Sequence, residues 1–438
     1  MLAVTLIRII QRTFVMLALA SPGVMAEAAA DLRVSSLSRD GTLAWAGASV
    51  PGICTLESAA SPGGPWAPLR NAFSTNTEAQ ASVPNLSSSS FYRLRSVDVP
   101  GTPMGFLNFV YSYGLLETIA GAGVGQVDGV SYWQSSFEGG PARLAALSRP
   151  HFAMADRAGN VYVADKDSHS ILRITPDGTI HTHAGTHVGG FNGDGPALAT
   201  SLQLNFPNGE WVRSDGVVYV FDTSNGRIRR VNTNGIMTTL FMATPDGSPV
   251  SIGRGLWVNE SESLCYFCAG TKLRQWTPAQ GVKTLAANFT ELGDFIVEAG
   301  ADLIVCDRGA NLVYRMTPSG SSVVIAGNGA ASGGGDGLPA LQTGLYGVRG
   351  VWAAPTGGYL LLTHDGSQLW YLDVAGMVHL MLNGGGGRTH AGDGAFFYTP
   401  IPTISEGRSV TLDADGNILV CESDYGYVRR IRFLPLRP

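Results

Sequence analysis

The sequence predicts an all-β protein: a six-bladed β-propeller that is closed by an N-terminal strand and preceded by a small β-sandwich module. Three observations predict it. The 438 residues include 57 glycines and only 14% charged residues, a balance typical of short apolar strands joined by tight turns. A strand pattern recurs six times in the second part of the chain. A spare copy of an outer strand precedes the first repeat, where it can complete the last one.

The overall charge excludes one class of function. The net charge is −5, and no block of like charge interrupts the sequence, so nothing marks a nucleic-acid surface. The five cysteines form no disulfide framework, and the pair in Cys265-Tyr-Phe-Cys268 lies in a strand pattern with no second pair to complete a zinc set. We therefore predict buried small residues at these positions, and no cofactor.

Residues 1–26 are predicted to be an export signal. Arg8 and Arg12 precede an apolar run, and Val24 and Ala26 are the small residues that a signal peptidase accepts, so cleavage is expected after Ala26. The alternative is a membrane anchor, because the apolar stretch is almost long enough to span a bilayer. With cleavage, no membrane segment remains, and the protein is expected in the periplasm, at the cell surface or outside the cell.

Residues 31–99 predict the small β-sandwich. Short runs separated by Pro, Gly and Ser clusters end in Ser90-Phe-Tyr-Arg-Leu-Arg95, where polar and apolar residues alternate. This ending resembles that of fibronectin-like accessory modules of secreted bacterial proteins. Residues 100–114, which begin Pro-Gly-Thr-Pro, are interpreted as a linker.

Residues 115–438 carry the repeats. A five-residue strand recurs at spacings of 39 to 58 residues: Val161–Asp165, Val218–Asp222, Leu264–Cys268, Leu303–Asp307, Leu360–His364 and Ile418–Glu422. A second strand follows each, and a third usually ends in Ala-Gly. With the strand that precedes the pattern, each repeat supplies four short antiparallel strands, which make one propeller blade.

The last repeat lacks its outer strand, because the chain ends soon after Ile431-Arg-Phe433. Leu116–Gly121 matches the missing Ala-Gly strand. Pairing it with the sheet of Ile418–Ile431 would close the ring and remove an exposed sheet edge.

Three long connectors contain Gly-Asp-Gly: Gly193–Gly195, Gly335–Gly337 and Gly392–Gly394. In the first, Asp194 and Pro196 predict a capped helical turn. Calcium binding is the alternative use, but each loop offers one carboxylate where several oxygen ligands are needed.

The repeats resemble a known family. Asp222-Thr-Ser-Asn-Gly-Arg-Ile-Arg-Arg-Val231 with Gly235–Thr239, and Ala184-Gly185 leading into Gly193–Ala197, are similar to the NHL repeat. The resemblance implies a six-bladed propeller that binds a ligand or a protein across one face. Cys268 and His364 depart from the pattern, which has aspartate at the end of this strand.

One mouth of the channel is the predicted binding site. The residues that enter the innermost strands are expected there: His151, Asn208, Arg254, Asp294, Arg349 and Arg408. The turns beside them carry Asp165, Asp222, Asp307, His364-Asp365 and Glu422. Three converging guanidinium groups suit a carboxylate, a phosphate or an acidic side chain.

The alternative for these residues is structural: the strand-end carboxylates can accept backbone N–H bonds, and the arginines can pair with them. His181, His183 and His187 share an outer strand region and could bind a metal, but they lie away from the channel. We predict no metal site and no catalytic residue.

The preferred function is therefore a binding or scaffolding module whose partner is an unknown protein or a small anionic ligand. The alternative is a metal-dependent lyase or lactonase of the six-bladed type. Its ligands would have to come from His151, Asn208, Asp294 and His364, and the three arginines oppose a cation there.

Overall fold

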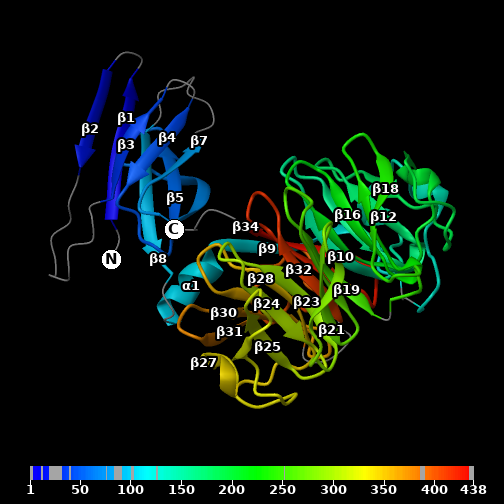
Figure 1. Cartoon of the computed structure of the whole chain (residues 1–438). Coiled ribbons are helices and arrows are strands. Elements are labelled where there is room, and N and C mark those ends of the chain that lie inside the picture. Colours follow the sequence, from blue (N-terminus) through cyan, green and yellow to red (C-terminus); the bar gives the residue numbers. More distant parts are fainter. Residues whose placement is uncertain are drawn as a thin grey trace.

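A computed structural model describes residues 3–10, 13–18, 32–38, 41–74, 76–82, 91–99, 103–124, 127–250, 252–384 and 390–433. Almost all of its regular structure is β-strand. In Figure 1 a group of strands from the N-terminal part, drawn in blue, lies beside a larger assembly of sheets coloured from cyan to red. No helix in the described ranges is long and apolar enough to span a bilayer.

The N-terminal strands form two sheets, ordered β2-β1-β8-β5-β6 and β3-β4-β7. Their bounds are β1 Ala3–Ile10, β2 Thr13–Ala18, β3 Arg33–Leu37, β4 Thr42–Ala46, β5 Gly52–Ala59, β6 Ala67–Ser74, β7 Ala79–Ser82 and β8 Phe91–Asp98. Trp45, Leu56 and Leu94 belong to a core that both sheets share. β1 and β2 fall inside the predicted export signal, and its predicted cleavage position after Ala26 lies outside the described residues.

Six further antiparallel sheets contain the repeats, and we number them in chain order. The first three are β10 Pro150–Ala155, β11 Val161–Asp165, β12 Ser170–Ile174 and β13 Ile180–Ala184; β15 Pro207–Val212, β16 Val218–Asp222, β17 Arg227–Val231 and β18 Ile236–Met242, with β14 Ala197–Leu198; and β19 Gly253–Val258, β20 Cys265–Ala269, β21 Lys272–Thr277 and β22 Gly281–Ala286.

The last three sheets follow the same plan. They are β23 Leu292–Val297, β24 Leu303–Asp307, β25 Leu312–Met316 and β26 Ser322–Ala326; β28 Val348–Ala353, β29 Tyr359–Thr363, β30 Gln368–Leu372 and β31 Met377–Asn383, with β27 Leu338–Pro339; and β32 Gly407–Leu412, β33 Ile418–Glu422, β34 Tyr427–Phe433 and β9 Tyr113–Ala120. Short 3₁₀ turns lie in the loops within and between these sheets, at Ser135–Phe137, Ala142–Leu144, Lys166–Ser168, Ala199–Ser201, Thr223–Asn225 and Ala340–Gln342.

The innermost strands of the six sheets form a closed ring. β10, β15, β19, β23, β28 and β32 each contact the next, and β32 contacts β10. Buried apolar side chains fill the spaces between neighbouring sheets, such as Val163, Leu172 and Cys421 between the first and sixth. A ring of small antiparallel sheets packed in this way is a fold of the propeller type.

The predicted closing strand is confirmed. β9 pairs antiparallel with β34, with Leu116 opposite Ile431 and Ala120 opposite Val428. In Figure 1 the cyan β9 lies against the red β34. Glu117 of β9 also makes ion pairs with Arg430 and Arg432. Segments more than 300 residues apart therefore share one sheet, and β34 is no longer its edge strand.

The segment interpreted as a linker contains a helix. α1 spans Pro103–Tyr111 and buries Phe106, Phe109 and Val110 in the core beside the fifth and sixth sheets. Phe109 stacks on Tyr371 with ring centroids 4.5 Å apart. The spacing of these three residues puts them on one face of a helix. The segment was interpreted as a linker because it begins with Pro-Gly-Thr-Pro, and this helical spacing was overlooked.

The Gly-Asp-Gly connectors do not begin with a capped helical turn, so that expectation is wrong. Ala197 pairs as a strand residue with Met237, and the 3₁₀ turn starts only at Ala199. The Asp194 carboxylate accepts hydrogen bonds from Arg227 Nε at 3.0 Å and Thr239 Oγ1 at 2.6 Å. It therefore ties the connector to the outer strands of the second sheet and is not available as a cap.

The five cysteines are buried and free, as predicted. Cys265 and Cys268 both lie in β20 of the third sheet. Burial raises the pKa of both thiols well above the ordinary range, so they are held as neutral, unreactive thiols.

Candidate functional site

All six residues predicted at the channel mouth lie at an irregularity of the innermost strand. The pairing register shifts once in each of these strands: between Pro150 and Phe152, Pro207 and Gly209, Gly253 and Leu256, Leu292 and Phe295, Val348 and Gly350, and Gly407 and Val410. Each shift contains the predicted residue. A bulge leaves one residue out of the ladder and re-aims its side chain, which explains how six paired strands can each present a side chain at the mouth.

The backbone just before these residues is unusual in five of the six strands. Arg149, Phe206, Ile252 and Glu406 have φ values of 61°, 50°, 55° and 34°, and Gly347 has 64°. Each stands two residues before its mouth residue. A positive φ is rare outside glycine, and for β-branched Ile252 it is strained. Such strain persists only where the surrounding structure imposes it, and it concentrates at functional sites.

Glycines let the strands approach one another at the mouth. A Cβ atom on Gly209 would lie 1.8 Å from the carbonyl oxygen of Arg254, and one on Gly293 would lie 2.5 Å from that of Arg349. No side chain fits at such distances from backbone atoms. The absence of a side chain at Gly209 and Gly293 therefore allows their strands to pack this closely against the strands that carry Arg254 and Arg349.

The strand-end carboxylates have the structural use that we considered. Four of them accept the backbone N–H of a residue in the connector that leads into the same sheet: Asp165 from Ser148 at 2.6 Å, Asp222 from Asn205 at 2.8 Å, Asp307 from Thr290 at 2.8 Å and Glu422 from Ser405 at 2.9 Å. In every case the donor stands 17 residues earlier. These bonds fix the connectors, and thereby the bulges that carry the mouth residues.

The mouth arginines, however, do not pair with those carboxylates. Arg254 donates to Glu291 Oε1 at 2.6 Å and to the Leu292 carbonyl at 2.7 Å. Arg308, which sequence reasoning missed, donates to the same Glu291 oxygen at 2.8 Å and to Asp365 at 2.9 Å. Arg254 is therefore held in a chain of alternating charges.

Arg408 is held in a similar way. Its Nε donates to Ser423 Oγ at 2.6 Å, and its Nη2 donates to Glu406 at 2.9 Å. Burial lowers the pKa of Arg408 to about 10, and Glu406 opposes that shift. Its charge is thus compensated inside the mouth.

Arg349 has no such compensation. It is 2% exposed, its Nη1 has no hydrogen-bond partner, and no carboxylate in the described part of the chain lies within ion-pair distance. Burial lowers its pKa well below the ordinary value, the charges of Arg254, Arg408 and Arg308 lower it further, and the more distant Glu291 acts against them. A buried cation beside three others is costly unless an anion binds it.

Two histidines experience the same positive potential. His151 and His364 are both 6% exposed. Burial lowers the pKa of each, and Arg408 and Arg349 add to the effect. Both rings are therefore neutral at physiological pH. Nδ1 of His151 contacts Oδ1 of Asn208, so these two predicted residues are brought together.

Asp294 is turned toward the neighbouring sheet. Its Oδ1 accepts the Phe295 N–H at 2.8 Å, and a Cβ atom on Gly255 of the third sheet would lie 2.8 Å from that oxygen. Burial raises the pKa of Asp294 to about 7, and the charge of Arg349 acts against it. Asp294 therefore does not neutralise Arg349 by a direct ion pair.

Glu210 is a buried acid that sequence reasoning missed. It lies in β15 two residues after Asn208, is fully buried, and makes no hydrogen bond of normal geometry through either oxygen with a described residue. Burial raises its pKa well above the ordinary range. In the sequence Glu210 is a single polar residue in a largely apolar strand, and the repeat pattern does not single it out.

We expect Glu210→Gln to stabilise the protein increasingly as the pH rises. The native state raises the pKa of Glu210 above its unfolded value of about 4.3, so the folded form binds the proton more tightly. The wild type therefore loses stability as the pH rises from the unfolded pKa of Glu210 towards its higher folded pKa. Glutamine cannot ionise. Urea unfolding at about pH 5 and pH 8 measures the difference; an advantage that is absent at pH 8 would contradict a neutral Glu210.

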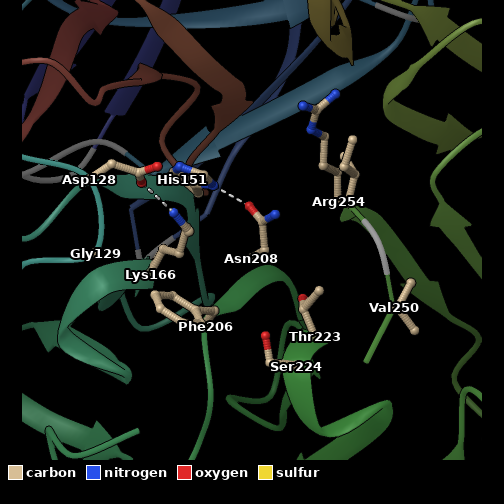
Figure 2. Close-up of a pocket in the computed structure, with 11 residues that line it drawn as sticks. Asp128, Gly129, His151, Lys166, Phe206, Asn208, Thr223, Ser224, Val250 and Arg254 are labelled. Atoms are coloured by element: carbon tan, nitrogen blue, oxygen red, sulfur yellow. Dashed lines mark hydrogen bonds and ion pairs between the residues drawn. The ribbon is translucent and has the colours of Figure 1, made fainter. Parts of the chain in front are cut away.

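A cavity of about 400 Å³ opens over the first three sheets at the mouth. Its lining combines cationic, polar and apolar groups: Asp128, Gly129, His151, Lys166, Phe206, Asn208, Thr223, Ser224, Val250, Ile252 and Arg254. Figure 2 shows Asn208 between His151 and Arg254, with Phe206, Thr223 and Ser224 grouped below it. Of the six predicted residues, His151, Asn208 and Arg254 line this cavity, together with Lys166, Thr223 and Ser224 from the turns after β11 and β16.

Tryptophans close the channel beneath the mouth. Trp211, Trp257 and Trp352 each stand three residues beyond a mouth residue on the same strand. Trp211 lies 6.3 Å from both Trp257 and Trp352, measured between ring centroids. Because the second and fifth sheets stand opposite each other in the ring, this contact spans the channel. Trp211 and Trp352 therefore approach each other across the channel.

The three outer histidines each contact a nearby side chain. His181 Nδ1 lies 2.9 Å from Glu138, and His187 Nε2 lies 2.9 Å from Thr182 Oγ1. His183 packs edge-on against Tyr162. Within the described ranges, no three His, Cys, Asp or Glu side chains are arranged to hold a metal ion.

Comparison with solved structures finds the same fold in several proteins. A structural genomics protein of unknown function from Bacteroides thetaiotaomicron matches with a TM-score of 0.60 and 12% identity, over 91% of this chain and 97% of that one. An auxiliary nutrient binding protein from the same organism matches with a TM-score of 0.54 and 11% identity, over 92% and 97%. A protein of the same description from Bacteroides ovatus gives 0.53 and 12%, over 89% and 94%.

These likenesses establish the fold alone, because the identities are low. No protein-family model matches the chain. No curated protein matches its sequence.

Proposed function

We propose that the chain is an exported, non-catalytic binding protein: a six-bladed NHL-type propeller, with a small β-sandwich module before it, that holds an anionic ligand at the channel mouth. The observation that carries the proposal is Arg349, a buried cation at the mouth whose Nη1 has no partner in the described part of the chain. Two of the similar structures are described as auxiliary nutrient binding proteins, which agrees with a binding role.

Binding is favoured over a metal-dependent lyase or lactonase by the charge of the site. Four arginines act on His364, two of them and Lys166 act on His151, and these charges oppose a divalent cation at the same place. A ligand carboxylate or phosphate would instead be attracted to these guanidinium groups.

We expect Arg349→Gln to abolish stabilisation by small anions without lowering the stability of the unliganded protein. Removing a buried, uncompensated charge is neutral or favourable for folding, whereas the anion loses its main partner. The melting temperature is measured with acetate and with inorganic phosphate at constant ionic strength, since a ligand of the native state raises it.

Arg143→Gln, at an exposed site in the connector before the first sheet, serves as the matched control. Unchanged anion stabilisation in Arg349→Gln, together with a fall in the melting temperature of the unliganded protein, would contradict the proposal and assign Arg349 a structural role.

A further inference from the structure

The cavity at the mouth contains one of the chain's own carboxylates. Asp128 lies in the connector before the first sheet, and it lines the cavity together with Gly129. Its Oδ1 forms ion pairs with Arg149 and with Lys166, the latter at 2.9 Å. Figure 2 shows the Asp128 carboxylate beside His151 and joined to Lys166. One oxygen of this acid therefore receives two cations.

The two cations are much better enclosed than the acid. The side chains of Arg149 and Lys166 are each 18% exposed, whereas that of Asp128 is 71% exposed. Lys166 is also held by groups other than Asp128, because its Nζ lies 5.2 Å from the centre of the Phe206 ring and 2.9 Å from Asp167 Oδ1. Lys166 would therefore keep its place if another anion replaced the Asp128 carboxylate.

The loop that carries Asp128 has little packing of its own. Val127 and Val130, on either side of it, are 58% and 42% exposed. A Cβ atom on Gly129 would meet no described atom within 4 Å. The Gly129 N–H donates to Asp167 Oδ2 at 3.0 Å. A segment that buries little apolar surface opens locally at low cost. The Asp128 carboxylate can therefore leave the cavity without unfolding of a sheet.

The potential at this position attracts anions in general. Lys166 holds the pKa of Asp128 below its ordinary value, and Arg149 and Arg408 contribute, although burial acts against them. The carboxylate is therefore ionised at physiological pH. An anion that enters the cavity from solvent is attracted by the same charges.

These observations describe an anion subsite that the chain fills with its own acid. We propose that Arg149 and Lys166 bind the carboxylate or phosphate group of a small molecule, and that Asp128 is a tethered competitor which this ligand displaces. The cavity of about 400 Å³ has room for the rest of such a molecule. Arg349 does not line this cavity, so the subsite lies outside the anion site proposed above.

The test is isothermal titration of the full chain with acetate and with inorganic phosphate, at low ionic strength to limit screening. A tethered group competes at an effective concentration on the order of millimolar. We therefore expect Asp128→Asn to bind at least one of the two anions about tenfold more tightly than the wild type does. A larger gain for acetate identifies a carboxylate as the ligand group, and a larger gain for phosphate identifies a phosphate.

Control variants separate displacement from a general effect of charge. Asp128→Glu keeps a carboxylate on the loop and should bind both anions as the wild type does. Asp215→Asn changes the net charge by the same amount as Asp128→Asn, because it removes an exposed carboxylate that pairs with Arg213 at 2.7 Å in the turn between β15 and β16. It should show no gain. Adding Arg149→Gln to Asp128→Asn should remove the gain.

The outcomes distinguish this subsite from the site at Arg349. Equal affinities of the wild type and Asp128→Asn for both anions, an equal gain in Asp215→Asn, or a gain that survives Arg149→Gln would overturn the subsite and leave the Arg349 proposal standing. A gain that is lost when Arg349→Gln is added would also overturn it, because the anion then binds Arg349. A gain that persists with Arg349→Gln supports the subsite even if Arg349→Gln alone contradicts the other proposal.

Discussion

Replacing Arg229 with methionine is expected to lower the free energy of unfolding by about 3–5 kcal/mol, because it leaves a buried carboxylate unpaired. Arg229 and Asp222 are both fully buried, with Nη1 of Arg229 3.3 Å from Asp222 Oδ2. Nη2 also donates to the Gly193 carbonyl at 2.8 Å. The arginine therefore joins the strand end of the second sheet to the Gly-Asp-Gly connector, and methionine can fill its space without making either bond.

The loss should depend on pH. Burial raises the pKa of Asp222 to about 6, although Asn225 and Arg229 act against this shift. In the wild type the charge of Asp222 is paired with Arg229. Without Arg229 this buried charge is unpaired, and only protonation of Asp222 removes it. The Arg229→Met variant should therefore be closer in stability to the wild type at about pH 5 than at pH 8, as measured by urea unfolding followed through tryptophan fluorescence.

The neighbouring Arg230 provides a matched control. It is half-buried and pairs with half-buried Glu262 at 2.6 Å, so Arg230→Met should cost only about 0–1 kcal/mol. Combining Arg229→Met with Asp222→Asn should recover part of the loss, because the uncompensated charge disappears. Equal costs for the two arginine variants, or no recovery in the double variant, would contradict the role assigned to the buried pair.

The sixth sheet contains a similar buried arginine–carboxylate ion pair. Arg429 is fully buried, pairs with Glu422 at 3.0 Å, and reaches Asp393 of another Gly-Asp-Gly connector, also at 3.0 Å. The repeated Arg-Arg of β17 and β34 and the Gly-Asp-Gly of the connectors thus contact each other in both sheets. Both were visible in the sequence, but their pairing was not, because they stand more than 30 residues apart.

The positions of the mouth residues could be predicted because they depend on the repeat. Each innermost strand begins at a fixed offset from the recurring pattern, so aligning the repeats placed all six predicted residues at the bulges of these strands. The closing strand was found in the same way, since an orphan Ala-Gly strand and an incomplete last repeat have one common solution.

The partners of those residues could not be predicted, because they are set by contacts between sheets. Glu291 and Glu406 lie in connectors where no pattern recurs, and they neutralise Arg254 and Arg408. Asp294 shares its offset with the arginines, yet it turns toward Gly255, where the missing side chain leaves space. A periodic pattern fixes where a residue stands in its own sheet but not what the adjacent sheet offers it.

Replacing Leu116 with alanine is expected to lower the free energy of unfolding by about 2–5 kcal/mol, although it lies far in sequence from the sheet it completes. Leu116 is fully buried, stands opposite Ile431 in the β9–β34 pair, and belongs to the core that α1 shares with the fifth and sixth sheets. The cavity would therefore open where the two ends of the ring meet.

A ring differs from an open array in how it responds to such damage. In an open array a weakened terminal unit frays alone, whereas in a closed ring each innermost strand contacts two others, so loosening the sixth sheet exposes the sides of the first and fifth. Leu116→Ala should therefore shift one cooperative urea transition to lower denaturant without splitting it. Leu198→Ala, at a position 59% exposed on a connector, should leave the midpoint nearly unchanged. A separate early transition in Leu116→Ala, with the rest of the ring unfolding as in the wild type, would show that the β9–β34 pairing is not what couples the sheets.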